Sequence, residues 1–314
     1  MVIIDILAPI IILVALGTLL HRTGFLSRDF FRKANHLVYW VGLPSLLFRK
    51  TANAMPQFGA AVSIVFMLLA GMVGCLILGY LVAGRLGLNR PARASFIQGT
   101  YRSNLVYVGL PVVLYALAAF DTNTPETEAL ALLAIAPMVP FYNAVAVMLL
   151  LGAEERLEFN VQQQMIQMLR GVVTNPLVIA CVLGVAFAYA GWSLPLFVDR
   201  TLEALGQMAL PLALLGIGAS LRLRTIREGG RVALAGSLIK ILFAPLVGLL
   251  VALAVGISGI EMQIGLLYLT MPTAVMSYVM ADQMGADGRL AGSIVVISTV
   301  LAMPALSVVL ALTA

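Results

Sequence analysis

Long apolar stretches, separated by short polar connections, run through the whole chain. Each is long enough to cross about 30 Å of hydrocarbon, alone or paired with a neighbour. They cover residues 3–21, 36–50, 59–84, 94–118, 129–151, 171–191, 200–221, 230–256, 262–281 and 289–312. The pattern predicts an all-α polytopic membrane protein with ten transmembrane helices. The stretch 36–50 is the shortest, and alternative assignments merge it with a neighbour or split it.

The composition supports a membrane protein. Of the 314 residues, 61% are hydrophobic and 11% are charged, and the mean hydropathy is +1.04. A soluble domain is about half apolar and about a quarter charged, so this apolar surface does not fit in one soluble core. The net charge of +5 comes mostly from short loops between apolar stretches, which argues against a nucleic-acid partner.

The basic residues also predict the orientation of the chain. Most of the 19 Lys and Arg residues lie in the first, third, fifth, seventh and ninth connections between apolar stretches. Because cytoplasmic loops carry an excess of Lys and Arg, these connections are expected in the cytoplasm. Both termini are then expected on the outer, periplasmic side of a bacterial inner membrane.

The chain repeats itself weakly. Val41-Gly-Leu-Pro44 resembles Met208-Ala-Leu-Pro211, and Pro140 has a counterpart in Pro304. The repeat predicts two five-helix halves, residues 1–152 and 170–314, joined by a cytoplasmic linker at 153–169 that we expect to hold a short interfacial helix. Because five is odd, the second half must enter the membrane from the opposite side, giving an inverted repeat as in many transporters.

One apolar stretch carries a charge beside two helix-weakening residues. Arg102, Ser103 and Asn104 are followed by Gly109 and Pro111. An arginine near mid-bilayer costs at least about 2.5 kcal/mol on insertion scales, and broken helices build midplane binding sites in transporters. Two interpretations of Arg102 stay open: a cation that satisfies freed carbonyls or snorkels, or a fixed charge for a substrate carboxylate, which a guanidinium binds bidentately.

Other polar residues in apolar stretches are candidates for the same site. Ser103 and Asn104 are expected to satisfy the break or donate to a carboxylate, whereas Gly109 and Pro111 are expected to be structural. A second interrupted stretch and the stretch after Pro140 add further candidates: Asn143, Thr270, Pro272, Thr273, Ser277, Tyr278 and, more weakly, Ser307.

Lys240 is the other cation inside an apolar stretch. A structural role is slightly favoured over proton coupling, which a buried lysine permits because it can lose its proton. The coupling ion, H⁺ or Na⁺, stays open. No phosphate-binding glycine loop, zinc-ligand cluster or Gly-x-Ser-x-Gly motif is present, so the sequence predicts neither an enzyme nor a cofactor site.

The motif Asn104-Leu-Val-Tyr-Val-Gly-Leu-Pro111 resembles the Asn-x-x-x-x-Gly-x-Pro of the auxin efflux carrier family, the PIN-like carriers and their bacterial relatives. The likeness extends to Asp5-Ile-Leu-Ala-Pro9, Pro44, Met271-Pro272 and Ala302-Met-Pro304. It implies inverted repeats with a scaffold part and a transporter part, and elevator-type alternating access. The fourth and ninth helices would be broken and would cross at Pro111 and Pro272, and Asn104 would contact the anion. Bacterial members are similar to malonate and other small-carboxylate carriers, and a homodimer through the scaffold helices is expected.

Two departures argue against an auxin-type pocket. Ser103 stands where plant carriers tend to have proline, and Leu47 stands where they have serine. The leading prediction is a secondary transporter of a small organic anion, a mono- or dicarboxylate that is malonate- or auxin-like, with the lipid bilayer as its other partner. The alternatives are a Na⁺-coupled symporter of the bile-acid type and a non-transporting membrane sensor on the same scaffold.

Overall fold

The computed structural model describes residues 2–54, 58–151, 166, 169–220 and 230–313, and all regular secondary structure within these ranges is helical. Five helical stretches are long and apolar enough to cross a membrane: Phe58–Arg85, Pro125–Leu151, Leu196–Ser220, Gly230–Val255 and Gly288–Thr313. Shorter apolar helices cover Ile6–Arg22, Leu105–Ala119 and Pro176–Tyr189. The prediction of an all-helical membrane protein is confirmed. The linker predicted at 153–169 lies almost wholly outside the described residues.

The chain forms two units, and each takes segments from both predicted halves. Unit 1 comprises residues 1–62, 106–137 and 170–221, and unit 2 comprises residues 63–105, 138–169 and 222–314. Unit 1 holds α1 (Val2–Arg22), α2 (Arg28–Leu37), η1 (Val38–Gly42), α3 (Leu43–Ala52), most of η2 (Leu105–Gly109), α6 (Leu110–Ala119), the start of α7 (Pro125–Leu151), α9 (Pro176–Tyr189), α10 (Leu196–Gln207) and α11 (Ala209–Ser220). The two five-helix halves, 1–152 and 170–314, stay a prediction.

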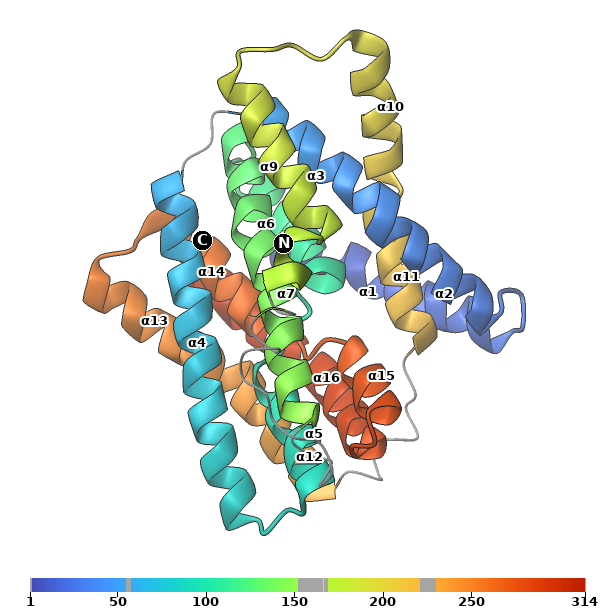
Figure 1. Cartoon of the computed structure of the whole chain (residues 1–314), viewed down its shortest axis with the longest axis vertical. Helices are drawn as coiled ribbons and strands as arrows, with labels where there is room; N and C mark the ends of the chain where they lie inside the picture. The colour runs from blue at the N-terminus through green and yellow to red at the C-terminus, as the bar shows by residue number, and fades with distance from the viewer. Residues whose placement is uncertain (1, 55–57, 152–165, 167–168, 221–229, 314) are drawn as a thin grey trace. The chain divides into compact units, whose positions relative to one another are not determined.

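Close backbone contacts hold the helices of unit 1 together. α1 packs on α11, and α3 packs on α9 (Figure 1). A Cβ atom at Gly218 would lie 1.9 Å from the Val14 carbonyl oxygen, and one at Gly17 would lie 2.1 Å from the Leu215 carbonyl oxygen. Such small residues let membrane helices approach closely. Because lipid is as apolar as the helix surfaces, helix association there depends on van der Waals packing. The Thr18 hydroxyl donates to the Gly218 carbonyl at 2.8 Å and adds a hydrogen bond to the same contact.

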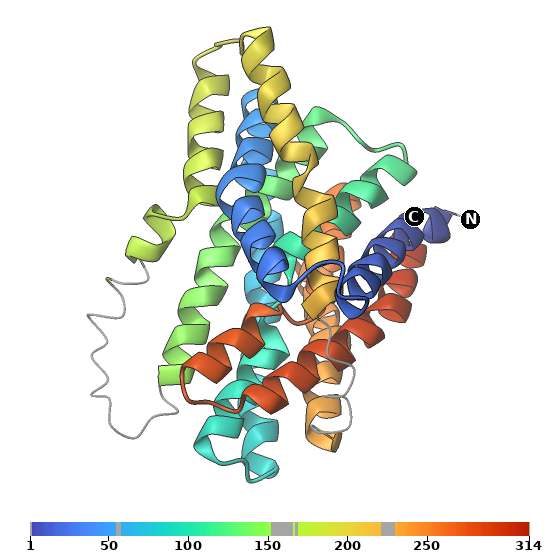
Figure 2. The same cartoon turned by 90° about the vertical axis from the view of Figure 1, so that its right-hand side faces the viewer.

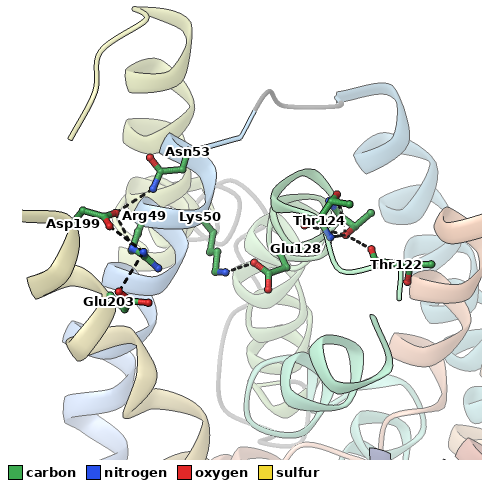
Figure 3. Close-up of polar contacts among 9 residues, drawn as sticks. Arg49, Lys50, Asn53, Thr122, Thr124, Glu128, Asp199 and Glu203 are labelled. Carbon is green, nitrogen blue, oxygen red and sulfur yellow. Dashed lines mark hydrogen bonds and ion pairs between the residues drawn. The ribbon is translucent and has the colours of Figure 1, made fainter. Parts of the chain in front are cut away.

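Ion pairs also join three helices of unit 1 (Figure 3). Arg49 of α3 donates to both carboxylate oxygens of Asp199 in α10, at 2.8 and 3.0 Å, and lies 3.5 Å from Glu203. Lys50 pairs with Glu128 of α7. Every cation in this cluster therefore has a carboxylate beside it, so the charges are largely compensated within the protein.

Each of three helical stretches contains a π turn shortly before a proline. The π segments η1, η2 and η4 (Ile239–Phe243) end two residues before Pro44, Pro111 and Pro245, respectively. Proline has no N–H and its ring clashes with the carbonyl four residues back. In the π turns the N–H of Leu43 donates to the Val38 carbonyl and that of Ala244 donates to the Ile239 carbonyl, each five residues back. Proline here widens the helix and does not break it.

Unit 2 contains most of α4 (Phe58–Arg85), α5 (Arg90–Tyr101), the rest of α7, α12 (Gly230–Leu238), η4, α13 (Ala244–Val255), α14 (Gly259–Thr270), α15 (Met276–Gln283) and α16 (Gly288–Thr313). α4 and α5 are neighbours joined by a short loop (Figure 1), and α15 folds back on α16 (Figure 2). Leu269, near the end of α14, fills a socket made by two glycines. A Cβ atom at Gly71 or Gly248 would lie 2.4 or 2.1 Å from its methyl groups.

Candidate functional site

The first interrupted stretch breaks directly after Tyr101. α5 ends there, and Arg102 has ψ 88°, outside the helical region. The N–H groups of Ser103 and Asn104 therefore cannot continue the helix, and the carbonyls of Gly99 and Thr100 lose their usual donors four residues on. In an apolar environment each such group needs another partner.

The second interrupted stretch breaks between α14 and α15. Met271 has extended backbone at the end of α14, and α15 begins at Met276. Pro272 follows Met271, and the residue before a proline is biased away from the helical region. The carbonyls of Leu269 and Thr270 are freed in the same way as those of the first break.

The two breaks cross each other and form backbone hydrogen bonds as a short antiparallel pair of segments. Ser103 and Thr273 form an antiparallel bridge. The N–H of Asn104 donates to the Pro272 carbonyl at 2.8 Å, and the N–H of Ala274 donates to the Arg102 carbonyl at 2.9 Å. The two predicted broken helices thus cross in unit 2, at Pro272 as expected but at residues 102–104 and not at Pro111, which lies in the regular helix α6.

Side chains satisfy three more backbone groups at the crossing. The Thr273 hydroxyl donates to the freed Gly99 carbonyl at 2.7 Å, and Ser298 of α16 accepts the Thr273 N–H at 3.1 Å. The Lys240 ammonium donates to the freed Leu269 carbonyl at 2.6 Å. Each of these side chains is at most 1% exposed. These backbone groups therefore have fixed partners, as an irregular segment inside a membrane requires.

Arg102 is the charged side chain at this crossing, and it is only 4% exposed. Its guanidinium donates to the Asn143 amide oxygen and lies 3.5 Å from the Ser277 hydroxyl oxygen. Both acceptors are neutral, and none of the ion pairs found among the described residues involves Arg102. The positive charge is held in place by hydrogen bonds but is not neutralised by them.

Aromatic packing places Asn143 beside Arg102. The residues just before each, Tyr101 and Tyr142, meet edge to face with ring centroids 5.8 Å apart. The Tyr101 hydroxyl also donates to the Tyr142 carbonyl at 3.3 Å. These contacts fix α7 against the end of α5, so that Arg102, directly after Tyr101, can donate to Asn143, directly after Tyr142.

The structure gathers most of the predicted site residues at the crossing. Arg102, Ser103, Asn104, Asn143, Pro272, Thr273 and Ser277 meet there. Tyr278 follows Ser277 in α15, and its ring lies against Gly292. Ser307 donates to Met303 of its own helix.

Gly109 and Pro111 lie farther along the chain. Gly109 is the last residue of η2 and Pro111 lies in α6, both after the break. The backbone hydrogen bonds of the crossing are made by residues 102–104. Thr270 donates back to Leu266, as a lone threonine in a membrane helix commonly does.

Two polar residues at the crossing were missing from the sequence prediction. Ser298 lies in the middle of a regular helix with no proline or charge beside it, so nothing local singles it out. Gln98 lies one helical turn before Arg102, is fully buried, and has no hydrogen-bond partner for its amide among the described residues. Its spacing of four residues from Arg102 was a usable signal, because residues i and i+4 share a helix face.

The site offers hydrogen bonds and charge, and it offers no metal ligand set. Within the described ranges, no group of three His, Cys, Asp or Glu side chains is placed to hold a metal ion. An arginine, the amides of Asn104, Asn143 and Gln98, and several hydroxyls suit the recognition of an anion or a polar group.

Comparison with known proteins places the chain in a family. A family model described as "Membrane transport protein" matches residues 2–310. An uncharacterized transporter of Methanothermobacter thermautotrophicus is 25% identical over 300 residues, covering 95% of this chain and 94% of the relative. An uncharacterized transporter of Methanocaldococcus jannaschii is 23% identical over 303 residues, covering 94% of each chain. This chain belongs to the membrane transport protein family, the auxin efflux carrier family that its Asn-to-Pro motif indicated.

Proposed function

We propose that the protein is a secondary transporter of a small organic anion, a mono- or dicarboxylate. The observation that carries this proposal is Arg102, a buried guanidinium held at the crossing of two broken helices by neutral acceptors. Membership of a transporter family supplies the class of function. The substrate class comes from the chemistry of the site.

A buried charge without a counter-ion is costly, and a substrate carboxylate would remove that cost. Taking an ion out of water costs several kcal/mol after relaxation, and a partner of opposite charge repays it only with good geometry. A carboxylate forms two parallel hydrogen bonds with a guanidinium. The Ser277 hydroxyl lies 3.5 Å from the guanidinium, and Gln98 lies in α5 one turn before Arg102. We assign these two polar groups to the rest of a small ligand.

Alternating access of the elevator type fits the division of the chain. Both breaks, residues 102–104 and 271–275, belong to unit 2, together with Arg102, Asn143 and Ser277. A rigid crossing held by backbone and side-chain bonds is suited to carry a bound anion as one body. We include in the proposal ten transmembrane helices in an inverted repeat, with both termini outside a bacterial inner membrane.

The test is uptake of labelled small carboxylates, with malonate first, into proteoliposomes containing the purified full-length protein. Arg102→Gln should lower flux at least about 100-fold, because it removes the charge and keeps a hydrogen-bonding side chain of moderate length. Arg289→Gln is the matched control, since Arg289 is exposed at the start of α16. It should leave flux within twofold of wild type.

Each outcome is decisive. Wild-type flux in folded Arg102→Gln protein contradicts the role given to Arg102. Saturable carboxylate binding without flux in the wild type favours the sensor instead. Uptake that stops when Na⁺ is replaced by K⁺ favours the Na⁺-coupled symporter, and uptake that follows an imposed pH gradient favours H⁺ coupling.

A further inference from the structure

Unit 2 contains a second feature suited to a ligand, away from the crossing contacts of Arg102. A cavity of about 560 Å³ is lined by three helices: α4 contributes Leu76 and Tyr80, α5 contributes Arg90, Arg93, Ala94 and Ile97, and α7 contributes Val145, Met148 and Leu149. The α5 residues follow the i, i+3, i+4, i+7 spacing of one helix face. The cavity is therefore a groove about 10 Å long along α5.

The groove has an apolar floor and a basic rim. Ile97 and Ala94 are 1% and 6% exposed and form part of the floor. Arg90 and Arg93 are exposed at the opposite end of the same helix face. Among the described residues that line the groove, Arg90 and Arg93 are basic and none is acidic.

The rim is built at a helix boundary. α4 ends at Arg85 and α5 begins at Arg90, after the Asn89 side chain caps the helix by accepting from Ala92. The positive end of the α5 dipole therefore adds to the charge of the two arginines. Arg93 lies over the Tyr80 ring, 5.3 Å from its centroid. That contact orients the guanidinium and leaves its charge in place, because the ring is neutral.

We propose that this groove binds an anionic phospholipid, with the phosphate at Arg90 and Arg93 and the start of an acyl chain over Ile97, Met148 and Leu149. A ligand must match both ends of the groove, and a phospholipid joins one negative phosphate to a long hydrocarbon chain. Basic residues between membrane helices near the surface bind lipid headgroups in this way. A small soluble anion would use the rim but would leave the apolar floor unmatched.

The experiment uses the delipidated full-length protein in detergent, titrated with dioleoyl phosphatidylglycerol and followed by native mass spectrometry. Dioleoyl phosphatidylcholine has the same chains without net charge. Inorganic phosphate and glycerol 1-phosphate supply the charge without the chains. Phosphatidylglycerol should bind at least about tenfold more tightly than phosphatidylcholine, since each nearby basic residue contributes to anionic lipid binding. Millimolar phosphate should not displace it.

Two variants test the two ends of the groove separately. Arg90→Gln with Arg93→Gln should weaken phosphatidylglycerol binding at least about tenfold and leave phosphatidylcholine unchanged. Leu149→Trp should fill the apolar part and weaken binding of both lipids while the rim stays intact. The matched control, Arg85→Gln with Arg289→Gln, removes two exposed arginines that do not line the groove, and it should change lipid binding less than twofold.

The outcomes that overturn the proposal are equally specific. Equal affinity for the two lipids would show that the rim charge is not used. Displacement by inorganic phosphate would show a free-anion site. An equal loss in the Arg85 and Arg289 control would show general surface attraction. Lipid binding is measured without transport substrate, so its failure would leave the proposed carboxylate transport untouched, and the reverse also holds.

Discussion

Two arginines, Arg49 of unit 1 and Arg102 of unit 2, have opposite electrostatic surroundings. Arg49 makes two hydrogen bonds with Asp199, has Glu203 nearby, and its side chain is 19% exposed (Figure 3). Arg102 is more deeply buried and has only neutral acceptors among its hydrogen bonds.

The difference separates a structural charge from one suited to bind a ligand. The Arg49 guanidinium fork already holds a carboxylate, so its main effect is to join α3 to α10. The Arg102 fork is positioned but not neutralised, and an anion placed there would lower the cost of burying it. A buried arginine is therefore a stronger sign of ligand binding when no carboxylate of the protein lies beside it.

The largest expected effect comes from giving Arg102 a carboxylate of its own. Asn143→Asp changes an amide oxygen that already accepts from Arg102 into a carboxylate of the same size, and so makes the site resemble that of Arg49. Carboxylate flux should fall at least about 100-fold, which corresponds to about 2.7 kcal/mol. The melting temperature should not fall.

Two further variants control this change. Asn143→Ser keeps a neutral acceptor and should lower flux less than tenfold. Asn53→Asp makes the same chemical change beside Asp199, in the cluster that is already acidic, and should leave flux unaltered. Undiminished flux in Asn143→Asp would show that Arg102 does not serve as the anion partner.

The next largest effect concerns the rigidity of the crossing. In Gly248→Ala the new Cβ would lie 2.1 Å from a methyl of Leu269, so the Leu269 side chain must move. Leu269 is also the residue whose backbone carbonyl accepts from Lys240. We expect the free energy of unfolding to fall by about 1–3 kcal/mol, as for other overpacked cores. Gly84→Ala is the control, because nothing lies within 4 Å of its new Cβ, and alanine there should stabilise the helix slightly. Equal melting temperatures for the two variants would contradict the socket.

Removing the compensated arginine should change stability and leave transport intact. Arg49→Gln leaves Asp199 and Glu203 without their cation, at side-chain exposures of 23% and 42%. Because these carboxylates keep some water, we expect a loss of about 1–2 kcal/mol with unchanged flux per folded molecule. Arg200 is an exposed arginine of α10, the helix that holds Asp199 and Glu203. Arg200→Gln should change neither the stability nor the flux. Lost flux at an unchanged melting temperature would place Arg49 in the transport path and break the comparison.

The smallest expected effect is the loss of stability when a threonine hydroxyl is removed, at the crossing or within a single helix. Thr273→Val leaves the Gly99 carbonyl without its donor and should cost about 0.5–1.5 kcal/mol, the range of hydrogen bonds between membrane helices. Thr299→Val removes a hydroxyl that only donates back to Val295 of its own helix and should cost less than about 0.5 kcal/mol. Thermal unfolding of both variants in the same detergent compares them directly, and a larger loss in Thr299→Val would rule out the bridging role of Thr273.

Much of the candidate site could be predicted from local sequence, because polar residues stand out in apolar stretches. Arg102, Asn143, Thr273 and Ser277 were all found in this way. The position of the break was less accurate: Pro111 suggested an interruption near itself, but the π turn of η2 accommodates that proline and the helix breaks at residues 102–104. A proline removes one donor, and whether the helix breaks or widens depends on which other groups can reach the freed carbonyl.

The sequence by itself determined the apolar helices, the membrane class and the two polar interruptions, since these follow from hydropathy, charge and proline chemistry acting over short distances. Only the tertiary structure decided which carbonyl Lys240 satisfies, that Ser298 supports Thr273, and that Arg49 meets carboxylates while Arg102 meets an amide and a hydroxyl. The physical reason is that a buried polar group is satisfied by whatever lies within about 3 Å in space. For these residues, those partners are 25 to 175 positions away in the chain.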